Sequence, residues 1–270
     1  MSDILVLAAF LSFAVFLLAR QQKYAAIAGW GCIVLNLWSE LPAFLGEDNF
    51  LYPALSLLSV PFLAITAERL LRQDPAVLRL SRMAAVATLI FVPFALVPVL
   101  RDGLIALVIT LAFQLVTALG HHPQMLAWDI MAENAFVNQI ITGCTGITAI
   151  AMMLGVACGE ELTPRQGLLA FLLVVPTIFI LNICRVAVVF IAVSNTWFVH
   201  FPDPRGPAAT GDANFFWAHN VFAEGFAIVF LLVLLWGLCR IIPGLADFAR
   251  ALPGVYYGRL RALVVGIAGR

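Results

Sequence analysis

Long apolar runs alternate with short polar segments along most of this chain. Runs with the length and character of spanning helices cover 4–19, 25–45, 50–67, 83–100, 138–158, 167–194 and 215–239. A helix needs about 20 mostly apolar residues to cross the hydrocarbon core of a bilayer. The pattern therefore predicts an all-α fold, a polytopic membrane helical bundle with about seven transmembrane helices.

The basic residues predict how this bundle is oriented. They follow the first predicted helix (Arg20, Lys23), the third (Arg69, Arg72, Arg79, Arg82) and the last (Arg240, Arg250, Arg259, Arg261, Arg270). Cytoplasmic loops are enriched in Lys and Arg, so all three groups are expected in the cytoplasm and the N-terminus outside. The acidic segment 40–48 then falls outside, in agreement with this orientation.

One further apolar run, 104–119, is constrained by parity. Both Arg82 and Arg240 are expected in the cytoplasm, so the number of crossings between them must be even. The helices 83–100, 138–158, 167–194 and 215–239 already supply four. We therefore predict that 104–119 is an interfacial or re-entrant helix that leads into the polar segment 121–138. A hairpin in which 120–137 returns as a helix is the alternative, but its polar residues make a poor surface for lipid.

Composition supports the membrane class and excludes others. Of 270 residues, 63% are hydrophobic and only 11% are charged, against about 25% charged residues in soluble domains. The formal net charge is zero, which argues against a nucleic-acid partner. The sequence contains no CxxC, HExxH or glycine-rich phosphate loop, so no metal or cofactor is expected. We expect one transmembrane domain over 1–270, with N-terminal helices in 1–100, the chemistry in 104–239 and a basic cytoplasmic tail in 240–270.

Three residues inside the apolar segments carry candidate chemistry: Cys144, Arg185 and His219. A charged side chain in hydrocarbon is costly, so Arg185 marks a functional interior. A thiol becomes a nucleophile when a base or a cation lies beside it. Counted along their helices at 1.5 Å per residue, all three fall in the outer half of the bilayer. The set predicts a cysteine nucleophile, an arginine that stabilises developing negative charge, and a histidine that transfers protons.

Each of these residues also has a structural interpretation. Cysteine packs as a small hydrophobic residue. Arg185 could extend toward the interface, or pair with Glu224 or Asp129. His219 could belong to an interfacial aromatic belt beside Trp217. Their common depth on three consecutive helices favours the catalytic interpretation.

Further residues are candidates for binding a substrate. They flank the three central residues or lie in the outer loop 195–214, which we expect to form a lid or platform: Thr145, Gly146, Asn182, Asn220, Trp197 and Arg205. The small residues beside Cys144 would let a substrate backbone approach. Asn182 lies one turn before Arg185 and shares its helix face.

The order of these steps resembles the exosortase/archaeosortase family. The matching steps are Cys144-Thr145-Gly146 early in one helix, Asn182 to Arg185 late in the next, and His219-Asn220 early in the last. The resemblance covers about 104–239. It implies an integral protein of the cell membrane, from an archaeon, with its active site toward the extracellular side.

The same resemblance implies a cysteine transpeptidase with Cys144 as nucleophile, Arg185 as transition-state stabiliser and His219 as the third catalytic residue. Its partner would be the membrane-inserted C-terminal helix of a secreted surface protein, which carries a short motif, an apolar helix and a basic end. Archaeosortases are linked to attachment of a prenyl-derived lipid, so a lipid amine is a possible acceptor. Some archaeal members carry a second arginine where this chain has His219, so the recognised motif stays open.

Two other classes of function fit part of this pattern. A transporter could bind an anion at Arg185, although no internal repeat of the kind common in transporters is present. A non-catalytic membrane scaffold would not require Cys144, Arg185 or His219.

Overall fold

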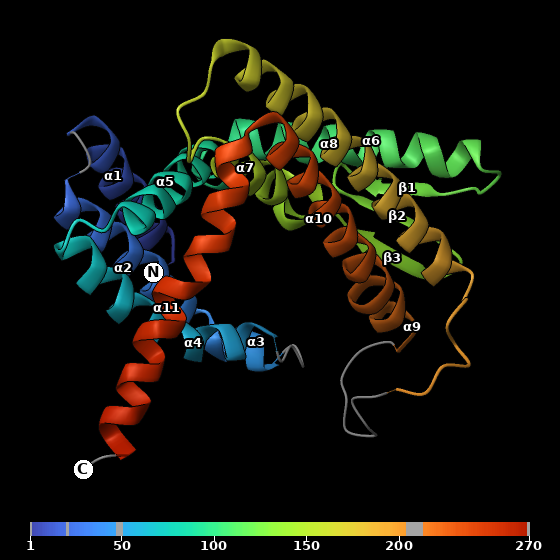
Figure 1. Ribbon diagram of the computed structural model, residues 1–270. Coiled ribbons are helices and arrows are strands. Elements are labelled where there is room, and N and C mark those ends of the chain that lie inside the picture. The colour runs from blue at the N-terminus through green and yellow to red at the C-terminus, as the bar shows by residue number, and fades with distance from the viewer. Residues whose placement is uncertain (1, 20–21, 47–50, 204–212, 269–270) are drawn as a thin grey trace. The chain divides into compact units, whose positions relative to one another are not determined.

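The computed structural model describes residues 2–19, 22–46, 51–203 and 213–268, and most of them are helical (Figure 1). The helices are α1 (Ser2–Leu18), α2 (Lys23–Ser39), α3 (Leu41–Gly46), α4 (Leu51–Leu71), α5 (Pro75–Leu96), α6 (Pro98–Ala118), α7 (Ile147–Ala157), α8 (Pro164–Ser194), α9 (Ala213–Phe215), α10 (Glu224–Ile241) and α11 (Pro243–Ala268). The strands are β1 (Gln124–Ala127), β2 (Ile130–Glu133) and β3 (Phe136–Gln139). The predicted all-α membrane bundle is confirmed as the fold class.

Five helices in the described residues are long and apolar enough to cross a membrane. They lie in Pro53–Leu71, Pro75–Leu96, Pro98–Ala118, Pro164–Ser194 and Ala213–Ile241. α1 and α7 are apolar but shorter. The expected number of seven crossings stays a prediction.

The boundary between α5 and α6 differs from the predicted end at residue 100. Val97 is extended (φ −96°, ψ 108°) and Pro98 begins α6. A residue before proline is pushed out of the helical region, and proline is well accommodated at a first helical position, so the chain breaks here. The run expected at 104–119 is thereby part of a helix of 21 residues, which has the length of a span.

The predicted helix over 138–158 is wrong in its first half. β3 extends to Gln139, a 3-10 turn covers Thr142–Thr145, and α7 begins only at Ile147. β1, β2 and β3 form an antiparallel meander. Asn134 (φ 50°) and Ala135 (φ 66°) make the two-residue turn between β2 and β3, and such a pair of left-handed residues matches the twist of a hairpin.

The chain divides into two compact units. Unit 1 comprises 1–92, 152–170 and 238–270, and unit 2 comprises 93–151 and 171–237. The chain passes between them within α5, α7, α8 and α10.

Unit 1 contains α1, α2, α4 and most of α5, together with the segment expected to be a basic tail. Phe13 and Phe16 of α1 pack with Leu70 and Val77 in its core. The C-terminal segment is helical, as α11, and packs on α4. Tyr256 stacks on Phe62 at 5.4 Å between ring centroids.

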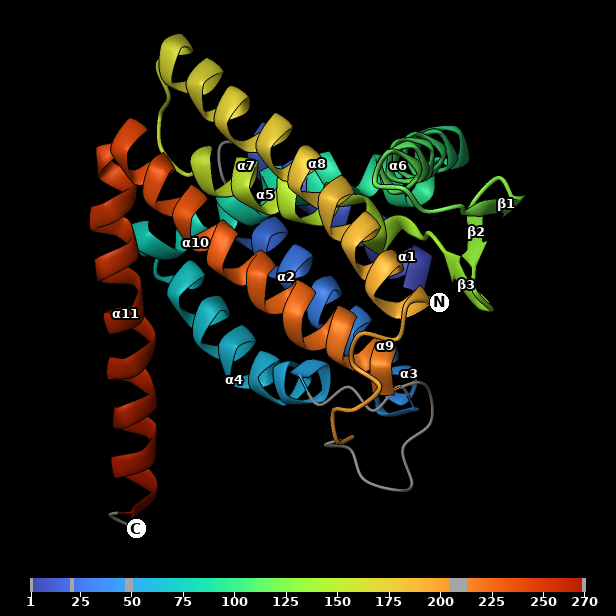
Figure 2. The same cartoon turned by 90° about the vertical axis from the view of Figure 1, so that its right-hand side faces the viewer.

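Unit 2 contains all the residues expected to carry chemistry. Its core joins the sheet to α6 and α8, and the sheet lies beside α6 (Figure 2). Met131 and Ile140 from the sheet region are fully buried with Val108 of α6 and Phe190 of α8. This packing fixes the path of the chain from β3 into the turn that holds Cys144.

Candidate functional site

Cys144 lies in the 3-10 turn Thr142–Thr145, between β3 and α7. Its backbone N–H donates to the Ile141 carbonyl at 2.8 Å, and the Thr145 hydroxyl donates to the Thr142 carbonyl at 2.7 Å. Cys144 is half-buried and packs against the core of unit 2. Among the described residues, its free thiol makes no hydrogen bond. The turn is held by a backbone hydrogen bond and by the Thr145 hydroxyl, and neither uses the sulfur.

Asn182 of α8 ties this turn to the helix that carries Arg185. The buried Asn182 side chain donates from Nδ2 to the Cys144 carbonyl at 2.8 Å. Gly146 ends the turn in the left-handed region (φ 78°). A methyl group in place of its hydrogen would lie 3.1 Å from both Cβ and Cγ of Asn182. Glycine is therefore required here both for the backbone conformation and for the close approach.

Arg185 lies one turn after Asn182 and contacts the histidine. Its Nη2 is 3.0 Å from Nε2 of His219. Its Nε is buried and has no hydrogen-bond partner among the residues that the structure describes. Within the described part of the chain no carboxylate forms an ion pair with Arg185, so the expected alternative pairing with Glu224 or Asp129 is not seen. A buried donor without a partner on a charged group costs free energy of folding. Such a group calls for an explanation other than stability, and this makes Arg185 a candidate for function.

The contacts of His219 determine its tautomer. Arginine has donors and no acceptor, so Nε2 of His219 must accept from Arg185. The ring proton then lies on Nδ1, which donates to Oδ1 of Asn220 at 2.7 Å. Phe215 stacks on the imidazole with centroids 5.0 Å apart and planes at 12°. In this arrangement His219 is neutral, and its basic nitrogen is covered by Arg185.

The backbone around His219 is unusual, since Phe216–Ala223 is π-helical. Such segments are rare and occur frequently at functional sites. The segment is anchored by Asn214, whose Nδ2 donates to the Val193 carbonyl and whose Oδ1 accepts from the Phe198 N–H, both at 2.9 Å. Asn214 and Phe215 were missed by sequence reasoning, because neither belongs to a recognisable motif.

The structure thus joins the expected catalytic residues in two contacts. Asn182 binds the backbone of Cys144, and Arg185 binds His219. The two contacts start three residues apart on α8, which is about 4.5 Å along the helix axis.

The expected substrate-binding residues have diverse surroundings. Thr145 is buried, and its hydroxyl donates within the turn. The side-chain oxygen Oδ1 of Asn220 accepts from His219. Trp197 is 55% exposed and follows the left-handed Thr196. Arg205 lies outside the described residues.

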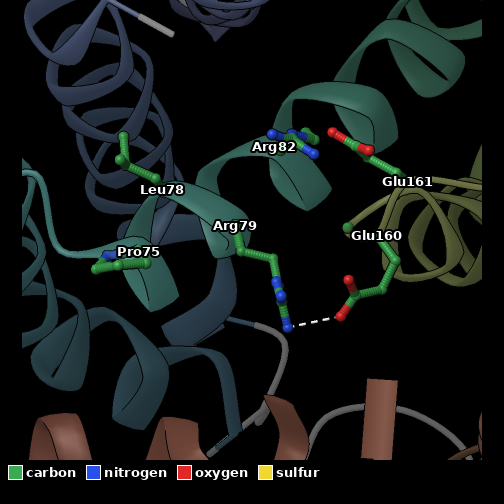
Figure 3. A pocket seen from close by; sticks show the side chains of 7 residues that line it. Pro75, Leu78, Arg79, Arg82, Glu160 and Glu161 are labelled. Atoms are coloured by element: carbon green, nitrogen blue, oxygen red, sulfur yellow. Dashed lines mark ion pairs between the residues drawn. The ribbon is translucent and has the colours of Figure 1, made fainter. Parts of the chain in front are cut away.

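A pocket of about 410 Å³ lies in unit 1, away from these residues in the sequence (Figure 3). It is lined by Pro75, Leu78, Arg79, Arg82, Gly159, Glu160 and Glu161. Arg79 forms an ion pair with Glu160 at 2.6 Å, and its guanidinium lies over the Phe248 ring. No group of three His, Cys, Asp or Glu residues in the described ranges could hold a metal ion.

Two curated relatives are similar to this chain. Archaeosortase A of Haloferax volcanii is 24% identical over 242 residues, which cover 81% of this chain and 80% of that protein. Archaeosortase A of Natronomonas pharaonis is 29% identical over 201 residues, which cover 66% of this chain and 62% of that protein. No family model matches the chain, and no solved structure matches it significantly.

Proposed function

We propose that this chain is a membrane-embedded cysteine transpeptidase of the archaeosortase/exosortase family, which its two archaeosortase A relatives support. Its clients would be secreted surface proteins, which it would cleave at a C-terminal sorting signal. Cys144 would be the nucleophile, Arg185 the stabiliser of the transition state and His219 the residue that transfers protons.

The observation that carries this proposal is the unpartnered donor of Arg185. Its Nε–H is buried and makes no hydrogen bond within the described ranges, while Nη2 is bound to His219. A preorganised donor in a water-poor site stabilises the oxyanion of acyl transfer far more than it would in water. Asn182, one helical turn before Arg185, binds the main-chain carbonyl of Cys144. The proposal requires that the sulfur attack a client carbonyl whose oxygen is within reach of the Arg185 donor.

The reaction proceeds by two acyl transfers. The Cys144 sulfur attacks the scissile carbonyl, the C–N bond breaks, and a thioester forms between Cys144 and the client. The thiol proton passes through Nε2 of His219 to the departing amine, which requires that Nη2 of Arg185 release this nitrogen when the client binds. An amine or water then attacks the thioester and restores the thiol.

The client enters as a helix in the membrane. Its apolar C-terminal helix would lie among the spanning helices, with the scissile bond near the outer interface and the basic end in the cytoplasm. Limited access of water would favour transfer to a lipid amine, such as a prenyl-linked one, over hydrolysis.

Replacement of the nucleophile tests this proposal directly. With Cys144→Ala in cells, a surface protein that ends in a short motif, an apolar helix and arginines should keep its full mass, and its migration on gels should not change. In the unmodified enzyme a Cys144-linked acyl species should form with this client and disappear on treatment with hydroxylamine. Normal client maturation in the Cys144→Ala strain would contradict the proposal.

A transporter with an anion site is the second candidate, because no carboxylate of the described residues forms an ion pair with Arg185. An anion site needs mainly the positive charge, so it should survive Arg185→Lys, whereas oxyanion stabilisation should not. Solute flux in proteoliposomes that persists in the Cys144→Ala variant would favour the transporter.

A further inference from the structure

β3 is an edge strand whose free side can be identified from its pairing. The Ile140 N–H donates to the Asp129 carbonyl at 2.8 Å, in line with the β2–β3 register of Gln139 with Ile130 and Val137 with Ala132. Hydrogen-bonded and non-hydrogen-bonded pairs alternate in an antiparallel ladder. Val137 and Gln139 therefore direct their backbone N–H and C=O groups away from β2.

These outward groups have no partner among the described residues. No backbone or side-chain hydrogen bond reaches the main chain of Val137 or Gln139 from outside the sheet. The Val137 side chain is 56% exposed. An edge of this kind is a template for pairing with another extended segment.

The two edge strands of the sheet differ in the segment to which each connects. From β3 the chain stays extended through Ile141 (φ −110°, ψ 172°), whose carbonyl accepts the Cys144 N–H. β1 forms the opposite edge, and it leads to α6 rather than to the cysteine. A peptide aligned on β3 would therefore be delivered to the Cys144 turn, and one aligned on β1 would not.

The side of β3 that packs inward also faces the histidine region. Phe136 lies 5.7 Å from Phe190 and 6.3 Å from Phe215, measured between ring centroids, and Phe215 stacks on His219. Side chains alternate between the two faces of a sheet. A strand added to β3 would place every second side chain on this aromatic face.

We propose that the client segment beside the scissile bond binds as an extended strand added to the β3 edge. This inference rests on the proposed function and specifies how its substrate is held. The outward N–H and C=O groups of Val137 and Gln139 would bind the client main chain whatever its sequence. Selection would come from the alternate client side chains, of which those on the aromatic face would be apolar.

A proline at the outward position tests this edge. Val137→Pro removes the outward N–H without breaking a bond to β2. Met125→Pro is the matched control, since Met125 pairs with Met131 and by the same alternation directs its N–H away from β2 on the β1 edge. We expect Val137→Pro to slow client processing at least about tenfold through the lost hydrogen bond, while Met125→Pro stays within about twofold of the unmodified enzyme. Equal rates in the two variants would overturn the proposal.

Cross-linking tests the same proposal without a proline substitution, so it does not depend on whether the proline variant folds. A photoreactive residue is placed at successive client positions around the cleavage site, and the Cys144→Ala enzyme is used to retain the uncleaved client. Adducts to residues 136–139 that rise and fall with a period of two client residues support an added strand. Adducts without this period, or adducts confined to other elements, contradict it.

These outcomes are separate from the failure of the proposed function. If Cys144→Ala still processes the client, the enzyme assignment fails. If Cys144→Ala is inactive but Val137→Pro and the cross-links show no role for β3, only the binding mode fails.

Discussion

Arg79 in unit 1 and Arg185 in unit 2 are both half-buried, but their partners differ in kind. Arg79 pairs with Glu160 at 2.6 Å and lies over the Phe248 ring. Arg185 binds the neutral imidazole of His219, and its buried Nε–H has no partner in the described part of the chain.

The difference separates a cation used for packing from one available for chemistry. The charge of Arg79 is neutralised by a carboxylate, so little of its field remains for a ligand. His219 neutralises none of the charge of Arg185, and under the proposed function its unpaired donor would bind negative charge that appears only during the reaction. Burial of an arginine alone would not distinguish the two cases.

The largest difference between the two units should appear when the arginine of each is replaced by lysine. Arg185→Lys should lower the rate of client processing by about 100-fold to 1,000-fold, because lysine has no counterpart of the Nε–H donor that would stabilise the oxyanion. Arg79→Lys keeps a charge beside Glu160 and should stay within about threefold of the unmodified rate. Client processing in membranes, followed by mass and migration, measures both. A rate for Arg185→Lys above one tenth of normal would contradict the proposed difference in role between Arg185 and Arg79.

A smaller effect is expected at the glycine that contacts Asn182. Gly146→Ala should cost roughly 1–2 kcal/mol of stability for the left-handed conformation and should displace Asn182, which lowers processing about tenfold or more. Gly120→Ala is the matched control in unit 2. Gly120 also has positive φ (90°), but a methyl group added to it would meet no atom within 4 Å.

Thermal unfolding in detergent and client processing should be measured for both glycine variants. Both variants should lose a similar amount of stability. Only Gly120→Ala should still process its client at the normal rate. If Gly146→Ala processes its client at the normal rate, the contact between Asn182 and the Cys144 turn has no role in catalysis.

The smallest effect should be found in unit 1, at the contact between α11 and α4. Tyr256→Phe removes the 2.9 Å hydrogen bond to the fully buried Thr66 hydroxyl and should cost about 1–2 kcal/mol of stability, with unchanged processing. Burial raises the pKa of Tyr256. The folded state therefore holds this proton more tightly, and its contribution to stability is full below pH 10 and declines as the pH rises above 10.

The pH dependence of unfolding checks this sign. Between pH 9 and 11, the unmodified protein should lose more stability than the Tyr256→Phe variant, as measured by denaturation in the same detergent. A larger loss in the variant would show that Tyr256 is not the group responsible.

The sequence by itself determined the class of the protein and the identity of its candidate chemistry. Apolar runs of sufficient length predict spanning helices because the bilayer imposes a length on any helix that crosses it. The predicted runs at 50–67 and 167–194 correspond to α4 and α8, with ends shifted by a few residues. The run at 215–239 corresponds to α9, the π-helical segment and α10 together, which cover Ala213–Ile241. Cys144, Arg185 and His219 were identified because polar groups in such runs are costly and rare.

Only the tertiary structure decided what surrounds these residues. The apolar content of 138–158 does not distinguish strand from helix, and strand pairing depends on contacts that no local pattern records. The placement of Cys144 on a 3-10 turn follows from that pairing and from the left-handed Gly146. The tautomer of His219 and the free donor of Arg185 likewise depend on partners from distant segments, because a hydrogen bond needs an angle and a distance that spacing along the chain does not specify.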